Sequence, residues 1–111
     1  MPDRIAVILA SGDAQVIDAG LMYARNAVKN RWMEDTKLFL FGPSEARIAT
    51  DDKLHDAVRE TLAAGITPVA CKACSDRASI GERLMELGCE IEYVGEPISR
   101  AIREGYVPMV W

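Results

Sequence analysis

The chain has 111 residues, of which half are hydrophobic and about a quarter are charged. This composition is typical of one globular domain and not of a disordered or fibrous protein, so we expect a single domain over residues 1–111. The formal net charge of −4 disfavours a protein that binds along phosphate backbones. Nucleic acid is therefore not an expected direct partner.

The amino-terminal stretch Met1-Pro2-Asp3-Arg4 leads directly into a short apolar run. It lacks the long apolar core and the small-residue cleavage site of a signal peptide. No run of residues approaches the length needed to cross a membrane. Three cysteines, an odd number, do not fit a disulfide-stapled secreted domain. We therefore expect a cytoplasmic protein without a membrane partner.

Apolar patterns with strand and helix periods alternate along the chain. The predicted strands cover residues 5–10, 37–41, 66–70, 90–94 and 107–111. The predicted helices are a long one through residues 17–28, a short helical turn and a longer helix between 44 and 64 with a break near 50–52, one that starts at residue 80, and one over 96–104. This alternation predicts the α/β class, as a three-layer α/β/α sandwich with a mostly parallel, roughly five-stranded sheet.

Three local patterns refine this expectation. The continuous β-branched run at 5–10 predicts the central strand, since it suits burial on both faces. Pro108 restricts the last strand to an edge, because proline cannot donate to the ladder. Ser79 and Glu82 have the spacing of a capping box, which predicts a helix start at Ile80 and leaves the segment before it as a loop.

Cys71 and Cys74 form a Cys-x-x-Cys motif directly after the third predicted strand. The carboxyl ends of strands are where α/β proteins place their functional groups. A thiol acts as a nucleophile in its thiolate form, which nearby Lys72 and Arg77 would favour, as would the amino end of the helix that starts near Ile80. Small neighbours suggest an open site with Cys71 and Cys74 as catalytic residues. The alternative is two buried cysteines that act as small hydrophobic residues.

Other polar residues add little to this candidate site. Zinc needs four ligands, and the remaining candidates, Cys89 and His55, are not paired at ligand spacing, so we expect no metal. Ser11 and Asp13 follow the first strand and could line a pocket at the same sheet edge as Cys71, although capping of the first helix explains them more simply. No phosphate-binding or dinucleotide motif is present, and we expect no cofactor.

The order of the elements and the cysteine segment resemble the DsrE/DsrF-like family, which includes the TusD-type sulfur-relay subunits. The resemblance covers nearly the whole chain and is sharpest over residues 69–77. Family members place a cysteine after this strand and a basic residue several positions later, often followed by glycine and an aliphatic residue. Cys71, Arg77 and Ile80 match this pattern, whereas Ala78-Ser79 stand where the glycine is common.

The resemblance implies a persulfide carrier, in which the Cys71 thiolate accepts sulfane sulfur from a donor protein and passes it to an acceptor cysteine. It favours Cys71 without excluding Cys74. It also implies a trimer or hexamer, and we expect a homo-oligomer. Two alternatives stay open: a non-catalytic oligomeric protein whose cysteine segment lines a small-ligand pocket, and a redox switch in which Cys71 and Cys74 close into a disulfide.

Overall fold

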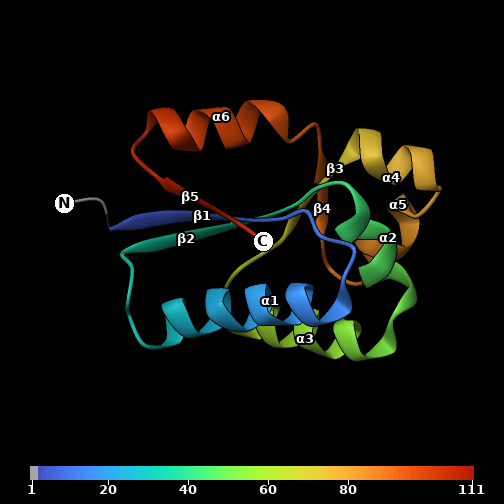
Figure 1. Ribbon diagram of the computed structural model, residues 1–111, viewed down its shortest axis with the longest axis horizontal. Coiled ribbons are helices and arrows are strands. Elements are labelled where there is room, and N and C mark those ends of the chain that lie inside the picture. The colour runs from blue at the N-terminus through green and yellow to red at the C-terminus, as the bar shows by residue number, and fades with distance from the viewer. Residues whose placement is uncertain (1–2) are drawn as a thin grey trace.

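A computed structural model describes residues 3–111. Within these residues five parallel strands form one sheet in the order β4-β3-β2-β1-β5 (Figure 1). The strands are β1 (Arg4–Leu9), β2 (Asp35–Leu40), β3 (Val69–Cys71), β4 (Glu90–Glu92) and β5 (Val107–Val110). The helices are α1 (Ala14–Lys29), α2 (Pro43–Thr50), α3 (Asp52–Ala63), α4 (Lys72–Ala78), α5 (Gly81–Glu86) and α6 (Gly95–Arg103).

The helices cover both faces of the sheet, so the predicted three-layer α/β/α architecture is confirmed. Helices α1 and α3 lie against one face and α6 lies against the other, while α2, α4 and α5 gather near the carboxyl ends of the strands (Figure 1). Strand β1 contributes to two cores, because its successive side chains point to opposite faces. Val7 packs with Leu21 in the larger core on the α1 face, and Ile8 packs with Ala101 in the smaller core on the α6 face.

The strand at the centre of the sheet is β2, so the prediction that residues 5–10 form the central strand is wrong by one position. Strand β1 still has a neighbour on each side, which explains its continuous apolar run. Strands β3 and β4 lie on one side of β2, and β1 and β5 lie on the other side, which puts β2 at the centre. Strand β5 is an edge, as Pro108 requires.

The segment after Cys71 is a helix, α4, and not the predicted loop. Alanine, lysine and arginine in this segment are good helix formers, and Lys72 pairs with Asp76 across one turn at 2.9 Å. Ser79 ends α4 in the left-handed conformation, with φ of 56°. A capping serine needs extended backbone angles, so the predicted capping box is wrong, and α5 begins at Gly81 without a side-chain cap.

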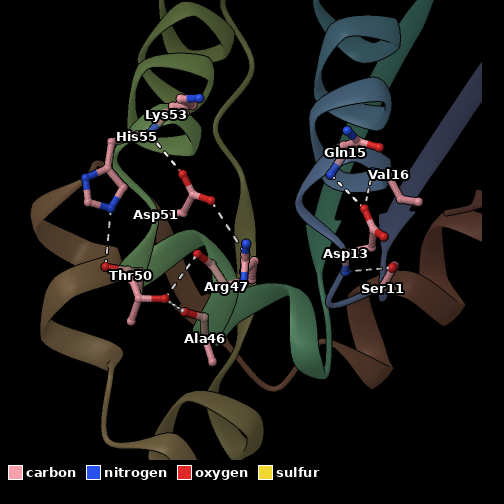
Figure 2. Close-up of polar contacts among 11 residues, drawn as sticks. Ser11, Asp13, Gln15, Val16, Ala46, Arg47, Thr50, Asp51, Lys53 and His55 are labelled. Carbon is pink, nitrogen blue, oxygen red and sulfur yellow. Dashed lines mark hydrogen bonds and ion pairs between the residues drawn. The ribbon is translucent and has the colours of Figure 1, made fainter.

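The break between α2 and α3 lies at Asp51, inside the predicted interval. Its carboxylate accepts a hydrogen bond of 3.0 Å from the main-chain amide of Lys53 and thereby caps α3 (Figure 2). Within residues 3–111, no helix combines the length and the apolar character needed to cross a membrane. Met1 and Pro2, the start of the stretch that was compared with a signal peptide, lie outside the described residues.

Candidate functional site

Two helices that follow neighbouring strands bring the candidate site together. Helix α2 follows β2 and α4 follows β3, and the two helices lie close together near the carboxyl ends of these strands (Figure 1). One ligating atom each of Glu45 in α2, Cys71 and Cys74 lies within 4.8 Å of the others. The two cysteines that the sequence singled out are therefore neighbours, and a carboxylate joins them.

The two thiols differ in access. Cys71 is the last residue of β3, is only 5 % exposed and belongs to the core under α6. Cys74 lies in the first turn of α4, is half-buried, and packs at the margin of the same core. The expectation of an open site is therefore wrong for Cys71. Cys74 is the thiol that a second molecule reaches more easily.

A main-chain amide is aimed at the more accessible thiol. The N–H of Gly42 donates a hydrogen bond to Cys74 Sγ at 3.3 Å. Gly42 has a φ of 63°, a conformation that side chains disfavour, and it forms the tight connection between β2 and α2. The β2–α2 turn thus supplies a fixed donor that favours negative charge on the Cys74 sulfur.

Glu45 lies in the first turn of α2 with a side chain that is buried almost completely, the residue being 1 % exposed. Within residues 3–111 neither of its carboxylate oxygens has a hydrogen-bond partner. Burial raises the pKa of Glu45 to about 7, while the facing Cys74 thiol and Cys71 amide lower it in part. Glu45 is thus a buried carboxyl group whose oxygens lack hydrogen-bond partners within residues 3–111.

The expected activation of the thiols by Lys72 and Arg77 is not supported. The Lys72 ammonium pairs with Asp76 on the surface of α4, and Arg77 lies exposed in the last turn of the same helix. Burial raises the pKa of Cys74, opposed by the Gly42 amide and reinforced by Cys71 and Glu45. This shift runs toward the protonated thiol, so it does not support the low-pKa thiolate that the sequence predicted.

Ser11 and Asp13 act as helix-capping residues. Asp13 Oδ1 accepts hydrogen bonds from the main-chain amides of Gln15 at 2.8 Å and Val16 at 3.2 Å, and Ser11 Oγ accepts one from Asp13 at 3.0 Å (Figure 2). These contacts satisfy the amino end of α1, which is the simpler of the two roles considered from the sequence.

The other two side chains weighed from the sequence remain outside the cluster formed by Glu45, Cys71 and Cys74. Cys89 is buried in the core on the α1 face, and burial raises its pKa to about 12. The His55 imidazole lies on α3, where Nε2 is 3.3 Å from the carbonyl oxygen of Ala49. Cys89 is thus a core residue.

Glu45 and Gly42 are the residues of the site that sequence reasoning missed. A signal was present for Glu45, since it shares helical spacing with the buried residues Ile48 and Ala49. A carboxylate on the buried face of a short helix is unusual enough to mark a candidate site. Gly42 had no comparable signal, because its contact with Cys74 depends on how α2 and α4 pack.

No protein-family model and no curated protein matches this chain. Several solved chains are similar in structure, including the following two. A conserved protein of unknown function from Bacteroides thetaiotaomicron is 24% identical with a TM-score of 0.89, over 98% of this chain and 95% of that one. A protein of unknown function from Methanobacterium thermoautotrophicum is 18% identical with a TM-score of 0.78, over 97% and 98%. At these identities the likeness defines a common α/β/α fold.

Proposed function

We propose that this protein is a sulfur-relay protein that carries sulfane sulfur as a cysteine persulfide at the Cys71–Cys74 pair. The observation that carries the proposal is a half-buried thiol, Cys74, that receives a main-chain hydrogen bond from Gly42 near the carboxyl edge of a parallel sheet. The resemblance of residues 69–77 to the DsrE/DsrF-like family supports the same function.

Cys74 is the carrier in this proposal, and Cys71 is the positioning thiol beside it. A donor protein must bring its persulfide within bonding distance of the accepting sulfur, which favours the more accessible of the two thiols. The Gly42 amide stabilises the thiolate during attack. This assignment differs from the preference for Cys71 that the family resemblance implies.

The transfer needs no net oxidation. The Cys74 thiol loses its proton to solvent, and the thiolate attacks the outer sulfur of a donor persulfide. A new S–S bond forms on Cys74 while the donor S–S bond breaks, and the donor leaves as a thiolate that takes up a proton. An acceptor cysteine then attacks the terminal sulfur in the same way, which regenerates Cys74.

The test is to incubate the reduced protein with a persulfide donor, alkylate it, and map any gain of one sulfur atom by mass spectrometry. Trypsin separates the three cysteines, because cleavage after Arg59, Lys72, Arg77, Arg83 and Arg100 yields peptides 60–72, 73–77 and 84–100. We expect the added sulfur on the 73–77 peptide. Cys74→Ser should abolish the gain, whereas Cys89→Ala, the matched control outside the cluster, should retain it.

Addition to the 60–72 peptide alone would make Cys71 the carrier and overturn the assignment within the pair. No addition to either cysteine of the pair in a folded, metal-free sample would overturn the carrier function itself. Circular dichroism of each variant confirms that a loss of loading does not reflect unfolding.

A redox switch is the second candidate, because the Cys71 and Cys74 sulfur atoms lie within 4.8 Å. Equilibration with glutathione buffers followed by alkylation measures whether a Cys71–Cys74 disulfide forms and at what potential. A pair that stays reduced under every buffer would exclude this candidate.

The small-ligand alternative expected the cysteine segment to line the pocket. A cavity of about 300 Å³ lies between α6 and the sheet and includes Lys37, Glu92 and Arg100 in its lining. The cysteine pair does not line this cavity, so ligand binding there would survive Cys71→Ser and Cys74→Ser. For the carrier function we propose a cytoplasmic homo-oligomer that meets separate donor and acceptor proteins.

A further inference from the structure

We propose that Glu45, Cys71 and Cys74 form a binding site for one thiophilic divalent cation of the zinc type. The sequence led us to expect no metal, since only cysteine and histidine were counted as ligands. The fold supplies the third ligand from α2, a helix separated in sequence from Cys71 by the whole of α3.

The ligand atoms suit such a cation. Zinc binds cysteine thiolates and carboxylate oxygens and favours tetrahedral geometry. Neighbouring ligand atoms in a tetrahedral zinc site lie about 3.6–3.8 Å apart. The three atoms here lie within 4.8 Å of one another, so small side-chain rotations bring them to bonding distance. A fourth position is left for water or for the thiol of another molecule.

The buried Glu45 carboxyl group is an independent observation that points to a ligand. Glu45 is 1 % exposed, and neither of its carboxylate oxygens has a hydrogen-bond partner within residues 3–111. Burying such a group without partners is costly, and buried carboxylates are usually paired with a cation or bound to a metal. A divalent cation between Glu45 and the two thiols would provide that partner.

The backbone around the ligands is anchored in the fold. Cys71 ends β3 in register with Glu92 of β4, and the hydroxyl of Ser44, the neighbour of Glu45, donates to the Leu9 carbonyl oxygen at 2.6 Å. Anchoring of this kind limits the rearrangement needed to bind. Binding displaces to solvent the two thiol protons and, where Glu45 is protonated, its carboxyl proton. No oxidation state changes, so the step is a simple exchange of protons for a cation.

The experiment is titration of the reduced, metal-free protein with Co²⁺ in the absence of oxygen, followed by displacement with Zn²⁺. Thiolate ligation to Co²⁺ produces a near-ultraviolet charge-transfer band, and a tetrahedral site produces strong visible bands. We expect one Co²⁺ per chain, both signatures, and loss of both signatures on stoichiometric addition of Zn²⁺. A wild-type protein that shows neither signature would overturn the proposal without recourse to any variant.

Variants then test each ligand. Cys74→Ser should weaken Zn²⁺ binding by about a hundredfold or more, and Glu45→Gln by about tenfold or more, by comparison with the losses seen when metal sites are perturbed. The matched controls are Cys89→Ala and Glu60→Gln, which alter a cysteine and an exposed glutamate outside the cluster, and both should change the affinity by less than about twofold. Unchanged affinity and spectrum in folded Glu45→Gln would exclude Glu45 as a ligand and overturn the three-ligand site.

The cation site and the carrier function use the same thiols but fail separately. Metal binding is measured on protein that carries no added sulfur, and sulfur loading is measured in the presence of a chelator. If both proposals hold, stoichiometric Zn²⁺ added to a sample without chelator should suppress loading of Cys74 by about tenfold or more, because a metal-bound thiolate is not free to attack.

Discussion

Glu45 places a carboxyl group on the face of α2 that Ile48 and Ala49 otherwise make apolar. The amino end of a helix favours negative charge, yet burial dominates here and raises the pKa of Glu45 to about 7. Removal from water affects the pKa of Glu45 more than the helix dipole does, because its carboxylate oxygens have no hydrogen-bond partner within residues 3–111. The consequence is a stability that depends on pH.

This dependence has a definite sign. Between pH 4.5 and about 7 the unfolded chain has lost a proton that folded Glu45 retains, so the free energy of unfolding falls as pH rises. The full effect is at most about 3 kcal/mol and is complete above pH 7. We predict that Glu45→Gln removes this decline, so that the stability of wild type relative to the variant drops by about 2–3 kcal/mol between pH 5 and pH 8. Urea unfolding at both pH values, with a chelator present, measures it.

The control for this prediction is Glu60→Gln, since the Glu60 carboxylate is exposed on α3, where it lies 3.4 Å from the mostly buried Arg25 guanidinium. Its stability relative to wild type should change by less than about 1 kcal/mol over the same range. A Glu45→Gln protein with the same pH slope as wild type would show that Glu45 is already ionised in the folded state.

At the scale of single elements, α1 depends on its cap. Asp13 satisfies two main-chain amides at the start of this helix. We predict that Asp13→Ala lowers the free energy of unfolding by about 1 kcal/mol, whereas Asp13→Ser, which keeps a capping oxygen, costs less. Sulfur loading of Cys74 should be the same in both variants and in wild type. A loading defect in folded Asp13→Ala, measured by the peptide mapping described above, would instead place Asp13 in the pocket considered from the sequence.

The packing of α1 on the sheet depends on Gly20. A methyl group added there would clash with the Leu9 side chain and would lie 3.2 Å from Trp111 Cγ, and Leu9 is fully buried. We predict that Gly20→Ala destabilises the protein by about 1–2 kcal/mol in urea unfolding, because overpacking outweighs the gain in helix propensity. Gly95→Ala in α6 is the matched control, since no atom lies within 4 Å of the added methyl, and it should be neutral or stabilising. Equal effects at the two positions would contradict this account.

Trp111 is held against the sheet by main-chain hydrogen bonds. Its amide donates to the Ile8 carbonyl oxygen at 2.9 Å, and its own carbonyl oxygen accepts from Ala10 at 2.9 Å. The indole packs near Tyr23, with ring centroids 6.3 Å apart. The end of the chain thereby extends the contact between β5 and β1.

At the scale of the whole molecule, the surface carries large apolar side chains that one chain leaves exposed. They include Trp32, Met85, Tyr93 and Val110, with Val110 on the edge strand β5 at 67 % exposure. Burial of such residues between copies would stabilise an oligomer. We predict a trimer or hexamer, with a mass in light scattering of three or six times that of the 12.2 kDa chain. A mass of one chain across micromolar concentrations would contradict the prediction.

Most of the fold could be predicted from the sequence, because the spacing of apolar residues along the chain indicates where helices and strands form. The run at 5–10 predicted β1, and the spacing of Ile17, Leu21 and Ala24 predicted the buried face of α1. The errors lie at α4 and in the strand order. A seven-residue helix is too short for a clear period, and the strand order depends on crossovers between distant segments.

The candidate site could also be predicted only in part from the sequence. Cys71 and Cys74 are close in sequence, so their spacing and their position after a strand could be recognised without a structure. The burial of Cys71, the hydrogen bond from Gly42 and the approach of Glu45 depend on the packing of α2 against α4. The sequence by itself determined the alternating elements and the thiol pair, since both follow from local residue order. Only the tertiary structure decided which groups surround the thiols, because burial and electrostatics depend on contacts between segments that are far apart in the chain.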